Sequence, residues 1–324
     1  MGKIQRALGI LRNDGDKSAA DERSAAPLES DPKNERSQTT TQAYEQRSSA
    51  VRSRRRYIAE DVVVDEQAPA FSIAVDVTEL KAQGLHPQDN DTELVAQEFR
   101  RIKRPVLNTA FTIAGAGEAD ANVIMMASAL PKSGKTFCSV NLAMSIARER
   151  DVGAVIVDAD VLKPNISRAF ELEDRVGLID YLLDSSVMLD DILVGTDLYD
   201  IVVVPAGRQH EEATELLASR RMQELIHALS QRYYARAIVV DTPPLLLTNE
   251  AHVLAENMGQ IVMVVEAGES SQESTIQAIS SLDRSKPINA ILNKARSVSF
   301  GGYGGGEYGY YSAAGKGQRY GKEE

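Results

Sequence analysis

The sequence has little cysteine, little histidine and no excess of positive charge. Cys138 is the only cysteine, which excludes an internal disulfide and fits a reducing compartment. The four histidines have no spacing typical of metal ligands, so we expect no protein-held transition metal. The net charge of −11 argues against nucleic acid as the main partner. Disulfide scaffolds, transition-metal enzymes and nucleic-acid-binding proteins are therefore poor interpretations.

Long apolar runs are also missing. No segment is long and apolar enough to span a bilayer, and the amino terminus has no hydrophobic secretory region, so we expect a cytoplasmic protein. Residues 1–90 are rich in Ser, Gln, Asp, Arg and Ala, and are predicted to be largely disordered, with short helices at 4–11 and 77–84. Residues 91–298 have the apolar content of one folded domain, and residues 299–324 form a flexible tail rich in glycine and tyrosine.

A phosphate-binding loop is predicted at residues 129–136, which read ALPKSGKT between an apolar strand and a helix. Gly134 lets the backbone curl so that N–H groups face anionic oxygens. Lys135 reaches the β- and γ-phosphates, and the hydroxyl of Thr136 can bind Mg²⁺. The first glycine of the usual pattern is replaced by Ala129, so this is a deviant Walker loop. The alternative is a Ser/Gly turn that binds nothing.

Ser133, within this loop, and Phe137, directly after it, complete the predicted ATP contacts in this part of the chain.

Three aspartates follow two other apolar runs. Residues 154–160 read AVIVDAD and residues 237–241 read AIVVD, without the alternation of a half-buried strand. Ligands of open parallel sheets bind at the carboxyl ends of the strands. We therefore expect Asp158, Asp160 and Asp241 to converge beside the loop, where they would hold Mg²⁺ and supply one catalytic base. Asp158, Asp241 and Thr136 are the predicted metal ligands. The alternative is that these aspartates cap helices or form turns.

Strands and helices alternate along the rest of the chain. This order predicts an α/β fold with a doubly wound, mostly parallel sheet and helices on both faces. Further helices are expected at residues 177–183, 188–193, 218–232 and 271–282. Further strands are expected at 201–204 and 288–292, and another is expected to end at 265.

The motifs ALPKSGKT, VIVDADVLKP and IVVDTPP, in this order, resemble the bacterial tyrosine kinases of capsule and exopolysaccharide systems, a P-loop family. The resemblance covers roughly residues 98–294 and the tail. It implies ATP and Mg²⁺ as cofactors and autophosphorylation on tyrosine. Lys163 and Pro164 match the basic residue and proline of the second motif, although the family more often has arginine at the first position. Related ATPases recognise adenine through an amide at the position of Asn293. The alternative is that this asparagine forms a turn.

Glu98, Arg101 and Arg104 match the E-x-x-R-x-x-R pattern that the kinases resembled by this chain share at a subunit interface. A spacing of three places them on one helical stripe. The resemblance implies self-association into a dimer or ring. A solvated face, or a basic patch with Arg100 and Lys103 for lipid or an anionic partner, would produce the same pattern.

The tail carries a cluster of tyrosines, and the resemblance implies that they are the phosphoacceptors; they are Tyr303, Tyr308, Tyr310, Tyr311 and Tyr320. The alternative is an ordinary low-complexity end. The resemblance also implies a membrane-anchored polysaccharide chain-length regulator as activator, a tyrosine phosphatase as partner, and recruitment to the inner face of the plasma membrane.

Two other classes share the expected fold. A partition-type ATPase switch would have a lysine where this chain has Leu130, and an iron–sulfur ATPase would need more cysteines than Cys138. An adaptor that binds nucleotide without turnover is a further alternative.

Overall fold

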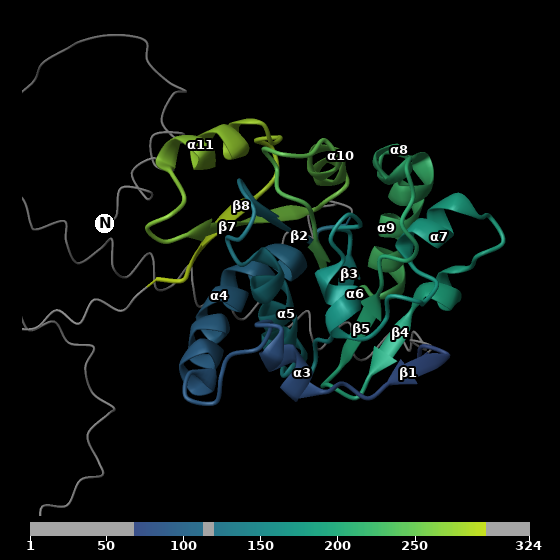
Figure 1. The fold of residues 1–324 in the computed structure, drawn as a ribbon, viewed down its shortest axis with the longest axis horizontal. Helices are drawn as coiled ribbons and strands as arrows, with labels where there is room; N and C mark the ends of the chain where they lie inside the picture. The colour runs from purple at the N-terminus through teal and green to yellow at the C-terminus, as the bar shows by residue number, and fades with distance from the viewer. Residues whose placement is uncertain (1–67, 113–119, 296–324) are drawn as a thin grey trace, which may run out of the picture.

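An eight-stranded sheet forms the centre of the protein in a computed structural model, which describes residues 68–112 and 120–295 (Figure 1). The strand order is β1-β4-β5-β3-β6-β2-β7-β8. All neighbouring strands are parallel except β4 and β5, which are antiparallel. The strands are β1 (Phe71–Ile73), β2 (Val123–Ser128), β3 (Ala154–Asp158), β4 (Val194–Thr196), β5 (Ile201–Val204), β6 (Ala237–Asp241), β7 (Gln260–Glu266) and β8 (Ile288–Asn293).

The central strands β2, β3 and β6 are buried along their whole length. Successive side chains of a strand point to opposite faces, so each run of apolar residues supplies both faces of the sheet. Met125 and Val240 belong to one hydrophobic cluster, and Met126 and Val239 belong to the other. Burial on both faces explains why these strands lack alternation in the sequence.

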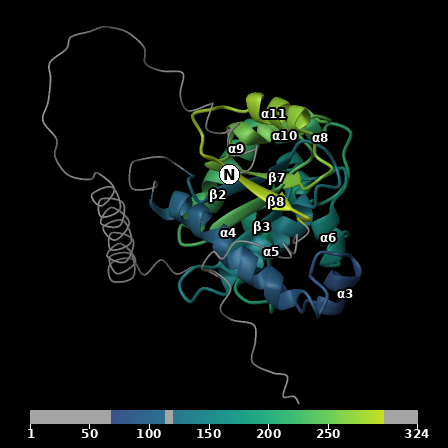
Figure 2. The same ribbon diagram turned by 90° about the vertical axis from the view of Figure 1, so that its left-hand side faces the viewer.

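Two groups of helices cover the faces. Helices α3 to α6 pack on one face, whereas α7 to α11 pack on the other, and Figure 2 shows the strands between α4 and α5 below and α10 and α11 above. The helices are α3 (Val77–Ala82), α4 (Thr92–Thr112), α5 (Lys135–Ala147), α6 (Asn165–Ala169), α7 (Leu178–Leu183), η2 (Leu189–Ile192), α8 (Ala213–Leu217), α9 (Arg220–Arg232), α10 (Glu250–Glu256) and α11 (Gln272–Ser280), where η2 is a 3₁₀ helix.

The predicted fold class is confirmed, and five short elements were not expected. Strands β1 and β4 have three residues each, and helices α6, α8 and α10 have five to seven. Elements this short carry too few residues to show a period. The helix expected at 188–193 is the shorter η2, followed at once by β4.

The region before residue 91 contributes to the domain. β1 pairs with β4, and α3 buries Leu80 completely in the core. Asp76 caps α3 by accepting a hydrogen bond from the N–H of Thr78 at 2.7 Å. The domain therefore takes in residues before the expected start at 91. The predicted helix at 4–11 and the tail lie outside the described residues. None of the helices in the described part of the chain is long and apolar enough to cross a membrane.

Candidate active site

The predicted phosphate-binding loop joins β2 to the start of α5. Gly134 is the residue before the helix, has a φ of +82°, and no side chain caps the helix there. The first N–H groups of an α-helix have no acceptor within the helix, so those of α5 are available to an anion. A Cβ atom at Gly134 would lie 2.1 Å from Nδ2 of Asn293. Both the positive φ and this close approach require glycine.

The ends of β7 and β8 hold the loop in place. Asn293 donates a hydrogen bond from Nδ2 to the carbonyl oxygen of Ser133 at 2.8 Å. Lys294 donates from Nζ to the carbonyl oxygen of Lys132 at 2.7 Å and pairs with Glu266 at 2.9 Å. Asn293 therefore contacts the loop itself, and adenine recognition by this residue stays a prediction.

Phe137 lies in the first turn of α5 and is partly buried. Its ring meets that of Phe99 edge to face, with the ring centroids 6.2 Å apart. Its side chain therefore packs against α4. Its role in binding ATP stays a prediction.

Asp241, at the end of β6, is the centre of the site. Its carboxylate is fully buried and accepts hydrogen bonds from Thr136 Oγ1 at 2.7 Å and from Ser139 Oγ at 2.9 Å. Nζ of Lys135 lies 3.2 Å from Asp241 Oδ1 and 3.8 Å from Asp160 Oδ2. The structure thus brings the predicted lysine, threonine and two aspartates together. Ser139 was missed, although a hydroxyl four residues after Lys135 faces the same side of the helix.

Asp158 lies opposite Asp241 in the register of β3 and β6. Its Oδ2 accepts hydrogen bonds from the N–H of Ser167 at 2.8 Å and from Ser167 Oγ at 2.7 Å. Its Oδ1 is buried and has no hydrogen-bond partner. Burial raises the pKa of Asp158 to about 7; the charges of Asp241 and Asp160 add to this, and the bonds from Ser167 oppose it.

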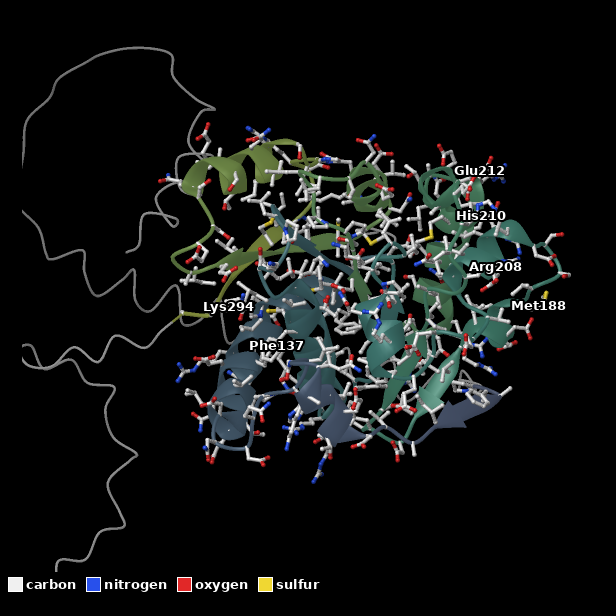
Figure 3. The ribbon with its side chains drawn as sticks, in the orientation of Figure 1. Phe137, Met188, Arg208, His210, Glu212 and Lys294 are labelled. Carbon is white, nitrogen blue, oxygen red and sulfur yellow. The ribbon has the colours of Figure 1, made fainter. Side chains whose placement is uncertain are left out.

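Ser167 is a second residue that the sequence analysis missed. Its Oγ also accepts a hydrogen bond from the N–H of Ala206 at 2.9 Å, so one hydroxyl joins Asp158 to the segment after β5. No motif predicts this link, because α6 and β5 are far apart in the chain. The same segment continues to Arg208, which pairs with Asp180 at 2.8 Å. Figure 3 shows Arg208 on the opposite side of the view from Phe137.

The site offers oxygen ligands that suit Mg²⁺. Thr136 and Asp241 supply a hydroxyl and a carboxylate, and the unpaired Oδ1 of Asp158 is a buried acceptor on the neighbouring strand, in register with Asp241. In residues 68–112 and 120–295 no three His, Cys, Asp or Glu side chains form a complete metal cage. Mg²⁺ commonly takes one or two carboxylates and completes its shell with water and phosphate oxygens. The residues present therefore fit this ion together with a nucleotide.

Asp160 and Cys138 differ in accessibility. The side chain of Asp160 keeps 11% of its surface exposed. Burial raises the pKa of its carboxyl, and the charge of Lys135 opposes this rise. Cys138 is buried in α5, where desolvation and then the charge of Asp241 raise the pKa of its thiol to about 12. A thiol held protonated in this way is no nucleophile, so Cys138 is a packing residue.

The residues predicted for the subunit interface lie on α4. Glu98, Arg101 and Arg104 are all exposed, whereas Phe99 and Val106 of the same helix are buried in the core. The structure therefore leaves the stripe free on the surface, and its interface role stays a prediction. The five predicted tail tyrosines lie outside the described residues.

Comparison with known proteins gives relatives among the bacterial tyrosine-protein kinases. No family model matches the chain. The tyrosine-protein kinase YwqD of Bacillus subtilis (strain 168) is 31% identical over 190 residues, which are 58% of this chain and 76% of that protein. The tyrosine-protein kinase CpsD of Streptococcus pneumoniae is 28% identical over 196 residues, or 60% of this chain and 84% of that protein.

A solved structure agrees in fold. The VpsO kinase domain is 23% identical, covers 64% of this chain and 100% of its own, and superposes with a TM-score of 0.53. The identity to YwqD, over most of that protein's length, establishes the relationship. The chain belongs to the family of bacterial tyrosine-protein kinases.

Proposed function

We propose that this protein transfers the γ-phosphoryl group of ATP to tyrosine hydroxyls, first those of its own tail, in a system that makes capsule or exopolysaccharide. One observation carries the proposal: Lys135, Thr136 and Ser139 of α5 all converge on Asp241 at the helix terminus that follows the phosphate-binding loop. Phosphoryl transfer needs mainly such positioning and electrostatic stabilisation.

Each residue of the site has its own role in the proposed reaction. Backbone N–H groups at the start of α5 bind the phosphates, and Lys135 places its charge beside the β- and γ-phosphates. Thr136 and Asp241 would hold Mg²⁺, with Asp158 as a third oxygen ligand, and the ion would supply neutralisation of charge on the phosphate oxygens. Asn293 and Lys294 keep the loop in this shape.

Asp160 is the best-placed base. It is more exposed than Asp158 and Asp241, which are fully buried, and its Oδ2 lies 3.8 Å from Lys135 Nζ. The tyrosine oxygen forms a bond to the γ-phosphorus as the bond to the bridging β,γ-oxygen breaks. The tyrosine proton passes to the carboxylate of Asp160, and ADP leaves.

The direct test incubates the purified full-length protein with Mg-ATP and detects phosphotyrosine. Lys135→Met is expected to abolish phosphotransfer without unfolding the protein, because this side chain faces the ligand site. Lys132→Met is the matched control, since its side chain is exposed and only its carbonyl group contacts Lys294. Unchanged phosphotyrosine in Lys135→Met would overturn the assignment of this site.

The family resemblance supports two further parts of the proposal. Mass spectrometry should place the phosphates on tail tyrosines, which are Tyr303, Tyr308, Tyr310, Tyr311 and Tyr320, and changing all five to Phe should remove most of the product. The cytoplasmic end of a membrane-anchored chain-length regulator should raise the activity and recruit the kinase to the membrane, and a tyrosine phosphatase should reverse the reaction. A kinase that is fully active alone at dilute concentration would contradict the need for an activator.

A further inference from the structure

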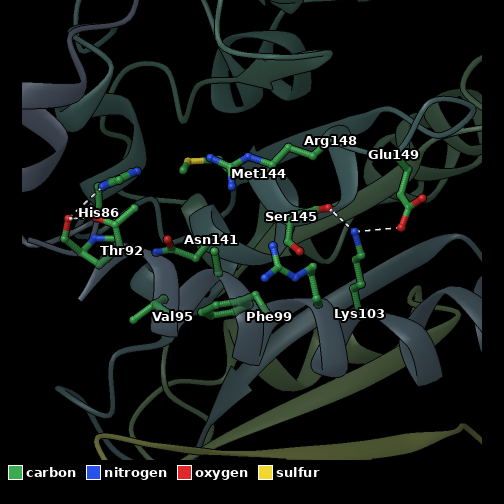
Figure 4. A pocket seen from close by; sticks show the side chains of 13 residues that line it. His86, Thr92, Val95, Phe99, Lys103, Asn141, Met144, Ser145, Arg148 and Glu149 are labelled. Atoms are coloured by element: carbon green, nitrogen blue, oxygen red, sulfur yellow. Dashed lines mark hydrogen bonds and ion pairs between the residues drawn. The ribbon is translucent and has the colours of Figure 1, made fainter. Parts of the chain in front are cut away.

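A pocket of about 300 Å³ lies between α4 and α5 (Figure 4). We call it the α4–α5 pocket, and its main lining residues are Val95, Phe99, Arg100, Asn141, Met144 and Arg148. Arg148 follows Lys135 by thirteen positions along α5 and its C-cap, which is about 20 Å at 1.5 Å per residue. No residue of the phosphate-binding loop and none of the three aspartates of the active site lines the pocket, so the pocket is distinct from that site. Its volume suits a ligand of side-chain size.

The pocket combines an apolar base with a positive rim. Phe99 is 5% exposed and Met144 is equally buried, so an aromatic and a thioether surface line the interior. The rim carries Arg100 and Arg148. Across residues 68–112 and 120–295, no carboxylate pairs with either arginine.

Neighbouring contacts hold this arrangement. Arg148 stacks over the ring of Tyr199, 4.7 Å from its centroid, and donates a hydrogen bond to the Tyr199 hydroxyl. Lys103 is buried; its Nζ donates to the Ser145 carbonyl oxygen at 2.6 Å and pairs with Glu149 at 2.9 Å, as Figure 4 shows. The charge of Lys103 is therefore compensated by Glu149. Two arginine charges remain for a ligand, on a chain whose net charge is −11.

We propose that the α4–α5 pocket binds a phosphotyrosyl side chain of this protein's own phosphorylated tail. An aryl phosphate matches both halves of the pocket: its ring packs on Phe99 and Met144, and its phosphate accepts charge-assisted hydrogen bonds from Arg100 and Arg148. A free phosphate would leave the apolar base unused. The proposal rests on the tail phosphorylation stated above.

The chain is long enough to deliver this ligand within one molecule. Asn293 contacts Ser133 at the start of α5, so the last described residues lie at the near end of that helix. Tyr308 follows residue 295 by thirteen positions. Thirteen extended residues span up to about 45 Å, and the length of α5 to Arg148 is about 20 Å. A tail released from an active site can therefore reach the pocket of its own subunit.

Docking there would affect assembly. Arg100 is adjacent to Arg101 on α4, and Arg101 with Glu98 and Arg104 forms the exposed stripe predicted as a subunit interface. A phosphorylated tail bound to the pocket lies beside this stripe and adds negative charge to it. In this way, binding of the phosphorylated tail to the α4–α5 pocket would weaken self-association.

The test is a binding titration on the full-length Lys135→Met variant, which should carry no phosphate. The probe is a fluorescent peptide of residues 304–317 with phosphates on Tyr308, Tyr310 and Tyr311, compared with the same peptide without phosphate. We expect the phosphopeptide to bind at least about tenfold more tightly. Arg100→Gln with Arg148→Gln should remove that difference. Arg150→Gln is the matched control, because Arg150 is exposed beside the pocket without lining it.

Competition identifies the ligand class. Phenyl phosphate should displace the phosphopeptide at lower concentration than inorganic phosphate does. Equal binding of the two peptides, or no effect of the double variant, would overturn the proposal. Vesicles of phosphatidylglycerol that bind through Arg100 and Arg148 while the phosphopeptide does not would show a lipid site instead. Because the peptide is synthetic and the protein inactive, this result is independent of whether the kinase test succeeds.

Discussion

The side-chain amide of Asn293 occupies the space into which a side chain at Gly134 would project. Nδ2 of Asn293 donates to the Ser133 carbonyl oxygen at 2.8 Å and lies 2.1 Å from the position of a Cβ atom on Gly134. The last strand of the sheet therefore sets the shape of the phosphate-binding loop, which comes 160 positions earlier in the chain. A change at either residue should alter nucleotide binding through the backbone of the loop.

Gly134→Ala tests this relationship, and Gly268→Ala is a matched control. Both glycines have a positive φ, +82° and +83°, but a Cβ at Gly268 has no atom within 4 Å. The control should lose about 1–2 kcal/mol of stability from backbone strain alone and keep its affinity for ATP. Gly134→Ala should be less stable than the control and bind ATP at least about tenfold more weakly, because Asn293 must move. Thermal unfolding and calorimetric titration measure both, and equal effects would refute the steric argument.

Asp158→Asn should stabilise the nucleotide-free protein in EDTA at alkaline pH. Its carboxyl is fully buried, and its pKa is about 7 in the folded state compared with 3.8 for an ordinary aspartate. A carboxyl whose pKa is raised by folding destabilises the native state, and this cost starts as pH rises above about 4 and is complete above about 7. A pKa difference of about 3 corresponds to up to about 4 kcal/mol, so removing the charge should raise Tm at pH 8 by up to roughly 8–16 °C.

The pH dependence separates charge from packing. At pH 5 most of the cost has not yet developed, so the wild type and Asp158→Asn should differ far less in Tm than at pH 8. A difference that stays constant between pH 5 and pH 8 would show that the amide acts through packing or hydrogen bonding. Phosphotransfer by Asp158→Asn should be strongly reduced at every pH.

Much of the site could be predicted because its residues lie next to strands with a strong signal. The runs before Asp158 and Asp241 are apolar throughout, and parallel strands bring their carboxyl ends to one edge. Ser139 and Ser167 could not be found in the same way, since a serine in a helix has no pattern of its own. Their roles depend on which carboxylate each meets across the sheet.

The same distinction applies to the fold. β3 and β6 could be located from composition, whereas β1 and β4 depend on pairing with each other and with β5. A three-residue strand is stabilised by its neighbours and has no local preference strong enough to predict. The α4–α5 pocket likewise arises from the packing of two helices, and Arg148 shows no relation to Arg100 in the sequence.

Ser167→Ala should lower kcat through Asp158. The hydroxyl joins Asp158 Oδ2 to the N–H of Ala206, so its loss leaves two buried polar groups with fewer partners. We expect a loss of about 1–3 kcal/mol in stability and a decrease in kcat of about tenfold, with little change in the KM for ATP. Ser230→Ala is the control, because Ser230 is also buried and donates to Asn122 at 2.7 Å, far from the site. If both variants lose the same stability and the same activity, Ser167 has no positioning role.

Arg101→Glu with Arg104→Glu should prevent self-association. Both side chains are exposed on α4 beside Glu98, and reversing their charges removes the attraction that such a stripe offers to a neighbouring subunit. Phosphates on the tail add about −1.5 to −2 charges per tyrosine and should have a similar effect on an acidic chain. Sedimentation should therefore give large particles for phosphatase-treated wild type, and small ones for ATP-treated wild type and for the double variant.

The control for this experiment reverses two other exposed arginines. Arg150→Glu with Arg220→Glu changes the net charge by the same amount, and Arg220 lies on α9, on the other face of the sheet. This control should associate as the wild type does and be phosphorylated normally, whereas Arg101→Glu with Arg104→Glu should be phosphorylated poorly because its tails meet no neighbouring active site. If both double variants dissociate alike, net charge governs assembly and the stripe on α4 is not the interface. If all samples have equal size, phosphorylation and assembly are not coupled through α4.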